Sequence, residues 1–166
     1  MQIRQAQVKD ITDLAEAFLH TVWKTQIDYF QKILDEQEKG QRVVLVARLN
    51  RKIVGFVNII WKSKYPRFVE QGIPEINDLR VLEEYRHKGV AMALMDEVET
   101  RIFKRSPSAG LGVGLYADYG PAQKMYIRRG YVLDGRGLMY KEKPVEPGRD
   151  VFVDDDLLLY LTKKRP

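Results

Sequence analysis

The sequence contains no cysteine and only two histidines among its 166 residues. Without cysteine the chain has no disulfide, no thiol nucleophile and no cysteine-ligated metal. His20 and His87 stand too far apart in the chain to give the ligand spacing of a zinc site. We therefore expect no metal ion, and we expect His20 to be structural.

Extended apolar segments are also absent. No apolar run approaches the roughly twenty residues of a membrane-spanning helix, and no charged segment followed by an apolar one opens the chain. A hydrophobic content of 45% with 31% charged residues is typical of a globular protein rather than a disordered one. The length predicts a single domain over residues 1–166, and we expect it to be soluble and cytoplasmic, with no membrane partner.

The charge shows a mild excess of one sign, with a formal net charge of +5 and an isoelectric point near 9.3. Such an excess occurs in proteins that bind nucleic acid or an anionic cofactor, and also in proteins that bind neither. No long run of Lys and Arg is interleaved with aromatic residues, and the basic residues Lys163–Arg165 are interpreted as a solvated end. We therefore expect no nucleic-acid partner.

The hydrophobic pattern changes repeatedly between a period of two and a period of 3.6, which predicts alternating strands and helices. Strands are expected at residues 2–5, 43–47, 53–61, 75–81, 110–116, 131–138 and 157–161. Apolar helix faces are expected from three sets: Ile11, Leu14, Ala15, Phe18 and Val22; Ile27, Phe30, Ile33 and Leu34; and Ala91, Leu94, Met95, Val98 and Ile102.

Several residues mark where these elements begin and end. Asp10 is expected to cap the first helix, with Asp13 completing a capping box, and Gly40 to end the second helix. A further short helix is expected to begin at Pro121. The segment 62–74 contains proline and glycine, and we expect it to be a loop.

The stretch from Glu75 to Met95 reads as a strand, a basic turn containing glycine, and then a helix. The first amides of a helix lack intrahelical acceptors, and the helix dipole adds about half a positive charge there. Gly89 allows the backbone to approach an anion, while Arg86 and Lys88 add two full positive charges. This combination predicts a binding site for a ligand with more than one phosphate group.

Glycines at 110, 112 and 114 alternate along another predicted strand. A dinucleotide-binding motif is excluded because a helix, not a strand, precedes these glycines, and the third glycine is misplaced. A strand face without side chains leaves room for a ligand or for another backbone segment.

The spacing Arg86-x-x-Gly89-x-Ala91 resembles the pyrophosphate-binding signature of the GNAT superfamily, the acetyl-CoA-dependent N-acetyltransferases. A second segment, Asp118–Val132, resembles that family's short helix with a Met-Tyr pair, followed by basic residues and Gly-Tyr. One departure is Tyr119, where the family often has Asn. The resemblance implies an α/β (α+β) fold, a single GNAT-like domain whose mixed, mostly antiparallel central sheet is flanked by helices.

The resemblance also implies a set of residues that bind acetyl-CoA. The amides of His87–Met92 would surround the pyrophosphate, and the main chain of Leu79–Val81 would pair with the pantetheine arm like an added strand. The full set implied is Leu79, Arg80, Val81, Arg86, His87, Lys88, Gly89, Val90, Ala91, Met92, Ala122 and Tyr126. Core packing is the alternative role for the side chains of Leu79 and Val81.

Three residues are candidates for proton transfer. The resemblance places Tyr126 as the general acid that protonates the departing thiolate, and half-buried packing is its alternative role. Glu75 stands where several family members carry the general base, and it would act through a water molecule; Asp78 is the competing candidate. Their odd separation places the two carboxylates on opposite faces of a regular strand, unless a bulge intervenes. A solvated surface carboxylate is the alternative for each.

These features predict that the chain transfers an acetyl group from acetyl-CoA to a primary amine by direct attack in a ternary complex. A polyamine, an amino sugar, an amino acid and a peptide N-terminus all remain open as acceptors, and a homodimer is an open option. Acceptor choice is assigned to residues 23–34, 62–74 and 139–156, where Trp23, Tyr29 and Phe30 either line a groove or pack in the core. The alternative is a non-catalytic acyl-CoA-binding or protein-interaction module.

Overall fold

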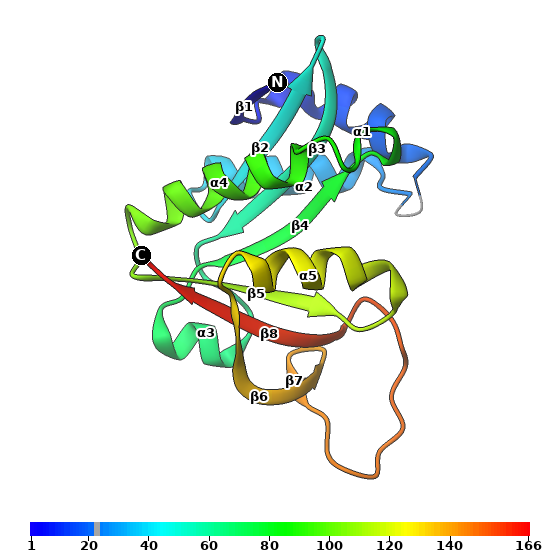
Figure 1. Cartoon of the computed structure of the whole chain (residues 1–166). Helices are drawn as coiled ribbons and strands as arrows, with labels where there is room; N and C mark the ends of the chain where they lie inside the picture. The colour runs from blue at the N-terminus through cyan, green and yellow to red at the C-terminus, as the bar shows by residue number, and fades with distance from the viewer. Residues whose placement is uncertain (22–23) are drawn as a thin grey trace. The chain divides into compact units, whose positions relative to one another are not determined.

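The computed structural model describes residues 1–21 and 24–166, which form two compact units (Figure 1). The first unit comprises Met1–Trp61 and Ile76–Lys104, and the second comprises Lys62–Glu75 and Arg105–Pro166. The expected helix-face residue at position 22 and the groove residue at position 23 lie outside the described residues. Within the described ranges, no helix has the length and apolar character needed to cross a membrane. One domain over residues 1–166 stays a prediction.

The first unit contains strands in the order β1-β2-β3-β4, with helices on both faces (Figure 1). Strands β1 and β2, and strands β2 and β3, pair antiparallel. The bounds of its elements are β1 (Gln2–Gln5), α1 (Ile11–Leu19), α2 (Ile27–Glu38), β2 (Arg42–Leu49), β3 (Lys52–Ile60), β4 (Glu75–Val81, whose first residue belongs to the second unit) and α4 (Val90–Phe103).

Different helices pack against the two faces of β3, because successive side chains of a strand point to opposite faces. Phe56 packs its ring edge-on against Phe18 of α1 and Phe30 of α2, with centroid distances of 4.9 and 5.5 Å. Its neighbour Gly55 faces α4, where a Cβ atom would lie 3.3 Å from the Leu94 side chain. The predicted apolar helix faces therefore supply much of this unit's core, except that Ile27 at the start of α2 is 43% exposed.

Asp10 is buried and occupies the N-cap position of α1, as the sequence predicted, but its side chain makes no capping hydrogen bond to this helix. Its carboxylate accepts the Gln7 amide at 2.8 Å and two hydrogen bonds from the Arg4 guanidinium at 2.7 Å, so it closes a 3-10 turn that precedes the helix. Asp13 completes no capping box either, because it pairs with Arg48. Burial opposes the charged form, yet the bonds from Arg4 and Gln7 outweigh it and lower the pKa of Asp10.

We expect Asp10→Asn to destabilise the protein by about 1.5–3 kcal/mol, because it removes the charge from buried, charge-assisted hydrogen bonds. Since the pKa of Asp10 is lower in the folded state, its contribution is present above the unfolded pKa of about 3.9 and is lost as the pH falls through the folded value. Urea unfolding at pH 7 and pH 3 measures both effects. The control Asp13→Asn removes a more exposed pair and should cost less than 1 kcal/mol, about the usual limit for surface ion pairs; equal losses would contradict the assignment.

The second unit contains strands in the order β5-β8-β6-β7. Strand β8 pairs antiparallel with both β5 and β6, and β6 pairs antiparallel with β7. The bounds of its elements are α3 (Pro66–Gln71), β5 (Ser108–Gly114), α5 (Gly120–Arg128), β6 (Val132–Tyr140), β7 (Lys143–Pro144) and β8 (Leu157–Lys164).

The segment 62–74 is not a plain loop, because it contains the helix α3. Pro66 stands in the first turn of this helix, where a missing amide hydrogen costs nothing, and Gly72 ends it with a left-handed φ of 62°. The prediction treated both residues as breakers, although they are also the residues that begin and end a helix. The buried ring of Phe68 fixes α3 against Tyr160 of β8, at a centroid distance of 5.4 Å.

The glycine face of β5 is filled by rings of the same unit, so it leaves no room for a ligand. A Cβ atom at Gly110 would lie 2.4 Å from the Phe68 ring, and one at Gly114 would lie 2.4 Å from the Tyr119 ring. A Cβ atom at Gly112 would lie 3.2 Å from Tyr160. These glycines admit aromatic packing, which corrects the expectation of space for a ligand.

Candidate functional site

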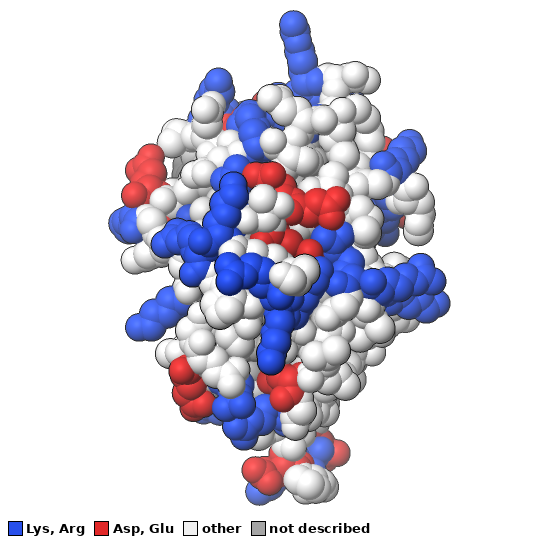
Figure 2. All heavy atoms as spheres, turned by 60° about the vertical axis from the view of Figure 1, so that its left-hand side comes forward, with Lys and Arg blue, Asp and Glu red and all other residues white. Residues whose placement is uncertain are grey.

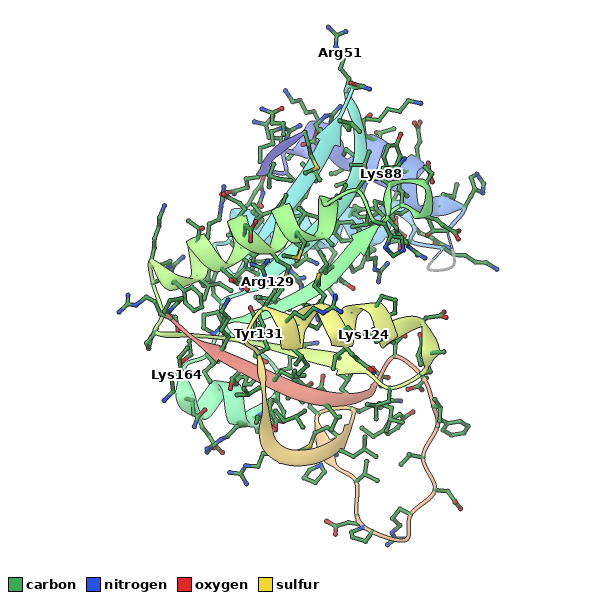
Figure 3. All side chains as sticks on the ribbon, in the orientation of Figure 1. Arg51, Lys88, Lys124, Arg129, Tyr131 and Lys164 are labelled. Carbon is green, nitrogen blue, oxygen red and sulfur yellow. The ribbon has the colours of Figure 1, made fainter. Side chains whose placement is uncertain are left out.

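The turn before α4 presents its backbone and two cations to solvent. Gly89 adopts a left-handed φ of 79° at the N-cap, and nothing lies within 4 Å of the position that a Cβ atom would take. Arg86, His87 and Lys88 are exposed, and Lys88 lies in the turn that leads into the helix (Figure 3). The Lys88 ammonium lies 5.5 Å from the centre of the Tyr85 ring. The predicted phosphate-binding residues are thus adjacent and exposed.

The first turn of α4 is anchored on one side and open on the other. Val90 is buried, Ala91 is half-buried and Met92 is 45% exposed. The first turn contains no acidic residue, so no carboxylate of this turn competes with an anionic ligand for the first amides of the helix. Because amides, dipole and cations all favour negative charge here, the turn fits the diphosphate group implied by the sequence.

Strand β4 is not regular, because Asp78 has a left-handed φ of 53°. This conformation breaks the alternation expected for a regular strand and corresponds to the bulge that the sequence left open. After it, Leu79 and Arg80 are half-buried and Val81 is buried. The side chains of Leu79 and Val81 pack at least in part, which leaves only their main chain for a pantetheine arm.

Both carboxylate oxygens of Asp78 accept hydrogen bonds within the first unit. Arg80 donates to Oδ1 at 2.9 Å, while the Tyr29 hydroxyl and the Asn58 amide, at 3.3 Å, donate to Oδ2. Arg80 also donates to the Thr25 hydroxyl at 2.6 Å. Burial, and then the nearby Asp78 charge, raise the pKa of Tyr29, so this phenol remains a donor. Asp78 is therefore a hydrogen-bonded ion-pair partner rather than a solvated carboxylate.

Glu75 is buried in the second unit, with 8% of its surface exposed. The Ser63 hydroxyl donates a hydrogen bond to its carboxylate and accepts the Tyr65 amide at 3.0 Å. Burial, and then the charge of Glu75, raise the pKa of the Tyr160 phenol. The carboxylate is thus buried and hydrogen-bonded, which is not the solvated alternative considered from the sequence.

Tyr126 is buried on α5, also in the second unit, and its ring meets Tyr131 edge-on at a centroid distance of 5.9 Å. Figure 3 shows Tyr131 where the chain leaves α5. Ala122 is half-buried one turn earlier, and Gln123 ties α5 to β5 by donating to the Gly114 carbonyl at 2.8 Å. Burial raises the pKa of Tyr126, which keeps its hydroxyl protonated and able to donate a proton.

Tyr119, the departure from the family pattern, has a structural role in the second unit. Its hydroxyl donates to Asp155 at 2.9 Å, and its ring lies edge-on to Tyr116 at 4.9 Å. The hydrogen bond that Tyr116 also donates to Asp155, together with burial, raises the pKa of Tyr116 to about 12. These two tyrosines tie the predicted acceptor segment 139–156 to the end of β5.

Sequence reasoning did not identify the partners that surround these residues. Asn58 is fully buried, and its side-chain oxygen has no hydrogen-bond partner. The sequence could have pointed to Asn58, because it carries the one side-chain amide within the otherwise apolar run Ile53–Ile60. Ser63 and Tyr160 gave no comparable signal, since one stands in a polar segment and the other in an apolar strand.

Residues that suit a metal ion are not grouped in the described part of the chain, where no cluster of three or more His, Cys, Asp or Glu side chains occurs. His20 and His87 are both exposed. On the face drawn in Figure 2, acidic side chains lie among the basic ones. The net positive charge is therefore not segregated from carboxylates on that face.

A family model described as the acetyltransferase (GNAT) family matches residues 8–131. A relative from Archaeoglobus fulgidus, named an uncharacterized N-acetyltransferase, is 29% identical over 127 residues, which cover 69% of this chain and 82% of the relative.

Two solved structures share the fold across nearly the whole chain. A ribosomal-protein-alanine N-acetyltransferase from Brucella melitensis is 19% identical, with a TM-score of 0.70 and coverage of 99% of this chain and 100% of that one. The paiA N-acetyltransferase from Thermoplasma acidophilum, solved in complex with coenzyme A, is 16% identical, with a TM-score of 0.66 and coverage of 99% and 98%. The expected fold class, α/β with a mixed, mostly antiparallel sheet flanked by helices, is confirmed. The chain belongs to the acetyltransferase (GNAT) family.

Proposed function

We propose that this protein is an N-acetyltransferase that moves the acetyl group of acetyl-CoA to a primary amine. The observation that carries the proposal is the turn before α4. Its open glycine, the helix N-terminus that follows and two exposed cations, Arg86 and Lys88, fit a diphosphate. Membership of the acetyltransferase (GNAT) family supports acetyl-CoA as the acetyl donor.

In the proposed reaction, the amine nitrogen attacks the thioester carbonyl directly, so a C–N bond forms as the C–S bond breaks. Glu75 takes a proton from the acceptor ammonium through a water molecule and later releases it to solvent. Tyr126 gives its proton to the leaving thiolate, and the second proton that the nitrogen loses on becoming an amide restores the Tyr126 phenol. The buried Tyr126 phenol is protonated at neutral pH, and the burial of Glu75 limits competing water. Holding both reactants contributes further, because orientation alone is worth about 7–11 kcal/mol in favourable cases.

We assign the base to Glu75 rather than to Asp78 because of what surrounds each carboxylate. Both oxygens of Asp78 already accept hydrogen bonds within the first unit, one of them from Arg80 at 2.9 Å, so this carboxylate is engaged in an ion pair. The Glu75 carboxylate is buried and accepts a hydrogen bond from the uncharged Ser63 hydroxyl.

The test is release of free thiol from acetyl-CoA in the presence of amines of four kinds: a polyamine, an amino sugar, an amino acid and a peptide with a free N-terminus. We expect amine-dependent release with one kind and an acetylated product detected by mass spectrometry. Initial rates should give intersecting rather than parallel double-reciprocal lines, because attack occurs in a ternary complex. Binding of acetyl-CoA without turnover of any amine would favour the non-catalytic binding module instead.

A further inference from the structure

Within β4, a residue other than glycine adopts the left-handed backbone conformation. L-residues rarely adopt this conformation, and Asp and Asn tolerate it best because their short polar side chains bond locally. Asp78, with a φ of 53°, is followed directly by the residues whose main chain is proposed to pair with the pantetheine arm. A strained conformation of this kind persists only where the surrounding structure fixes it.

The groups that fix Asp78 come from three different elements of the first unit. Tyr29 of α2 and Asn58 of β3 donate to Oδ2, and Arg80 of β4 donates to Oδ1. Asn58 also donates to the Tyr29 oxygen at 3.3 Å, so the two donors hold each other. We name Tyr29, Asn58 and Arg80 the Asp78 clamp.

The clamp is rigid because its members are packed. Asn58 has no exposed surface. The Tyr29 ring meets the fully buried Phe30 ring edge-on at 5.4 Å, and the Arg80 guanidinium lies 6.0 Å from the centre of the Tyr29 ring. A carboxylate held on both oxygens by packed donors cannot rotate freely, and this restriction passes to its backbone.

We infer that Tyr29 is a positioning residue for acetyl-CoA: by clamping Asp78, it holds the bulge that turns the main chain of Leu79–Val81 toward the cofactor. This role rests on the proposed function, because it presumes that this main chain binds pantetheine.

The test begins with Tyr29→Phe, which removes the hydrogen bond donated to Asp78 and the one accepted from Asn58, and keeps the ring. We expect the KM for acetyl-CoA to rise about tenfold, while kcat and the KM for the amine change less than twofold. Amide hydrogen exchange of the unliganded protein should become faster at residues 76–81. The matched control is Thr100→Val, which removes an exposed hydroxyl that donates to the Asp96 carbonyl at 2.8 Å in the first unit and should change neither measurement.

A second variant separates the clamp from a direct contact of Tyr29 with a substrate. Glycine adopts the left-handed conformation without support, so Tyr29→Phe introduced into Asp78→Gly should add less than a twofold change in KM to that variant. An additional tenfold rise in that background would overturn the inference, as would unchanged exchange at residues 76–81 in Tyr29→Phe. If the wild type binds no acetyl-CoA, the proposed function fails, and hydrogen exchange still decides whether Tyr29 holds the strand.

Discussion

Replacing Tyr126 by Phe should lower kcat by about 10²–10³-fold and leave the affinity for acetyl-CoA within twofold of wild type. The range is that of a lost general acid, which contributes about 10²–10⁴-fold. Burial raises the pKa of Tyr126, so the hydroxyl is a proton donor across the physiological range, and no other acid is proposed at the thiolate. The Phe ring preserves the edge-on contact with Tyr131, so stability should change little.

The matched control for this prediction is Tyr131→Phe, which leaves the Tyr126 hydroxyl and both rings in place. Turnover should fall less than threefold in the control. Single-turnover measurement of free thiol separates the chemical step from product release, and isothermal titration gives the affinity for acetyl-CoA. Equal turnover in wild type and Tyr126→Phe would remove Tyr126 from the chemistry and leave it a packing residue.

Replacing Glu75 by Gln should lower kcat with an amine acceptor by about 10²-fold, because general-base catalysis contributes about 10²–10⁴-fold. Gln keeps the size of the side chain and can still accept the Ser63 hydrogen bond. The loss should shrink as the pH approaches the pKa of the acceptor amine, because an amine that is already neutral needs no base. A pH–rate profile of kcat/KM from pH 6 to pH 10 measures this.

Asp78→Asn is the comparison that decides between the two carboxylates. Asn tolerates the left-handed conformation and retains one acceptor oxygen, so we expect a modest rise in the KM for acetyl-CoA without the pH-dependent loss of kcat. If Asp78→Asn, and not Glu75→Gln, shows the pH-dependent loss, the base is Asp78.

The sequence was informative where one periodicity or one motif determines the local structure. The helix after Gly89 follows from its apolar face, and Leu94, Met95 and Val98 are fully buried as expected. The turn before it follows from the spacing of Arg86 and Gly89, because helix amides, a permissive glycine and cations act together over a few residues.

The sequence was uninformative where a side chain depends on a partner distant in the chain. Asp78 reads as an ordinary strand carboxylate, and only Tyr29 and Asn58, 49 and 20 residues away, show why it leaves the regular conformation. The buried setting of Glu75 likewise depends on Tyr160 of the last strand.

Glycines and prolines gave the weakest predictions, since each is compatible with several structures. Pro66 and Gly72 read as loop residues and instead delimit α3. Gly110 and Gly114 read as space for a ligand, whereas they make room for Phe68 and Tyr119. Which meaning applies depends on the rings that pack nearby, and these lie elsewhere in the sequence.

The most direct test of the central claim is thermal unfolding with and without acetyl-CoA, beside the same measurement with NAD and ATP. At about a hundred times its dissociation constant, a ligand that binds only the folded protein stabilises it by roughly 2.7 kcal/mol. We predict a clear rise in the unfolding temperature with acetyl-CoA and a smaller rise or none with NAD and ATP. No rise at saturating acetyl-CoA would contradict the cofactor assignment, and the proposed roles of Glu75 and Tyr126 would fall with it.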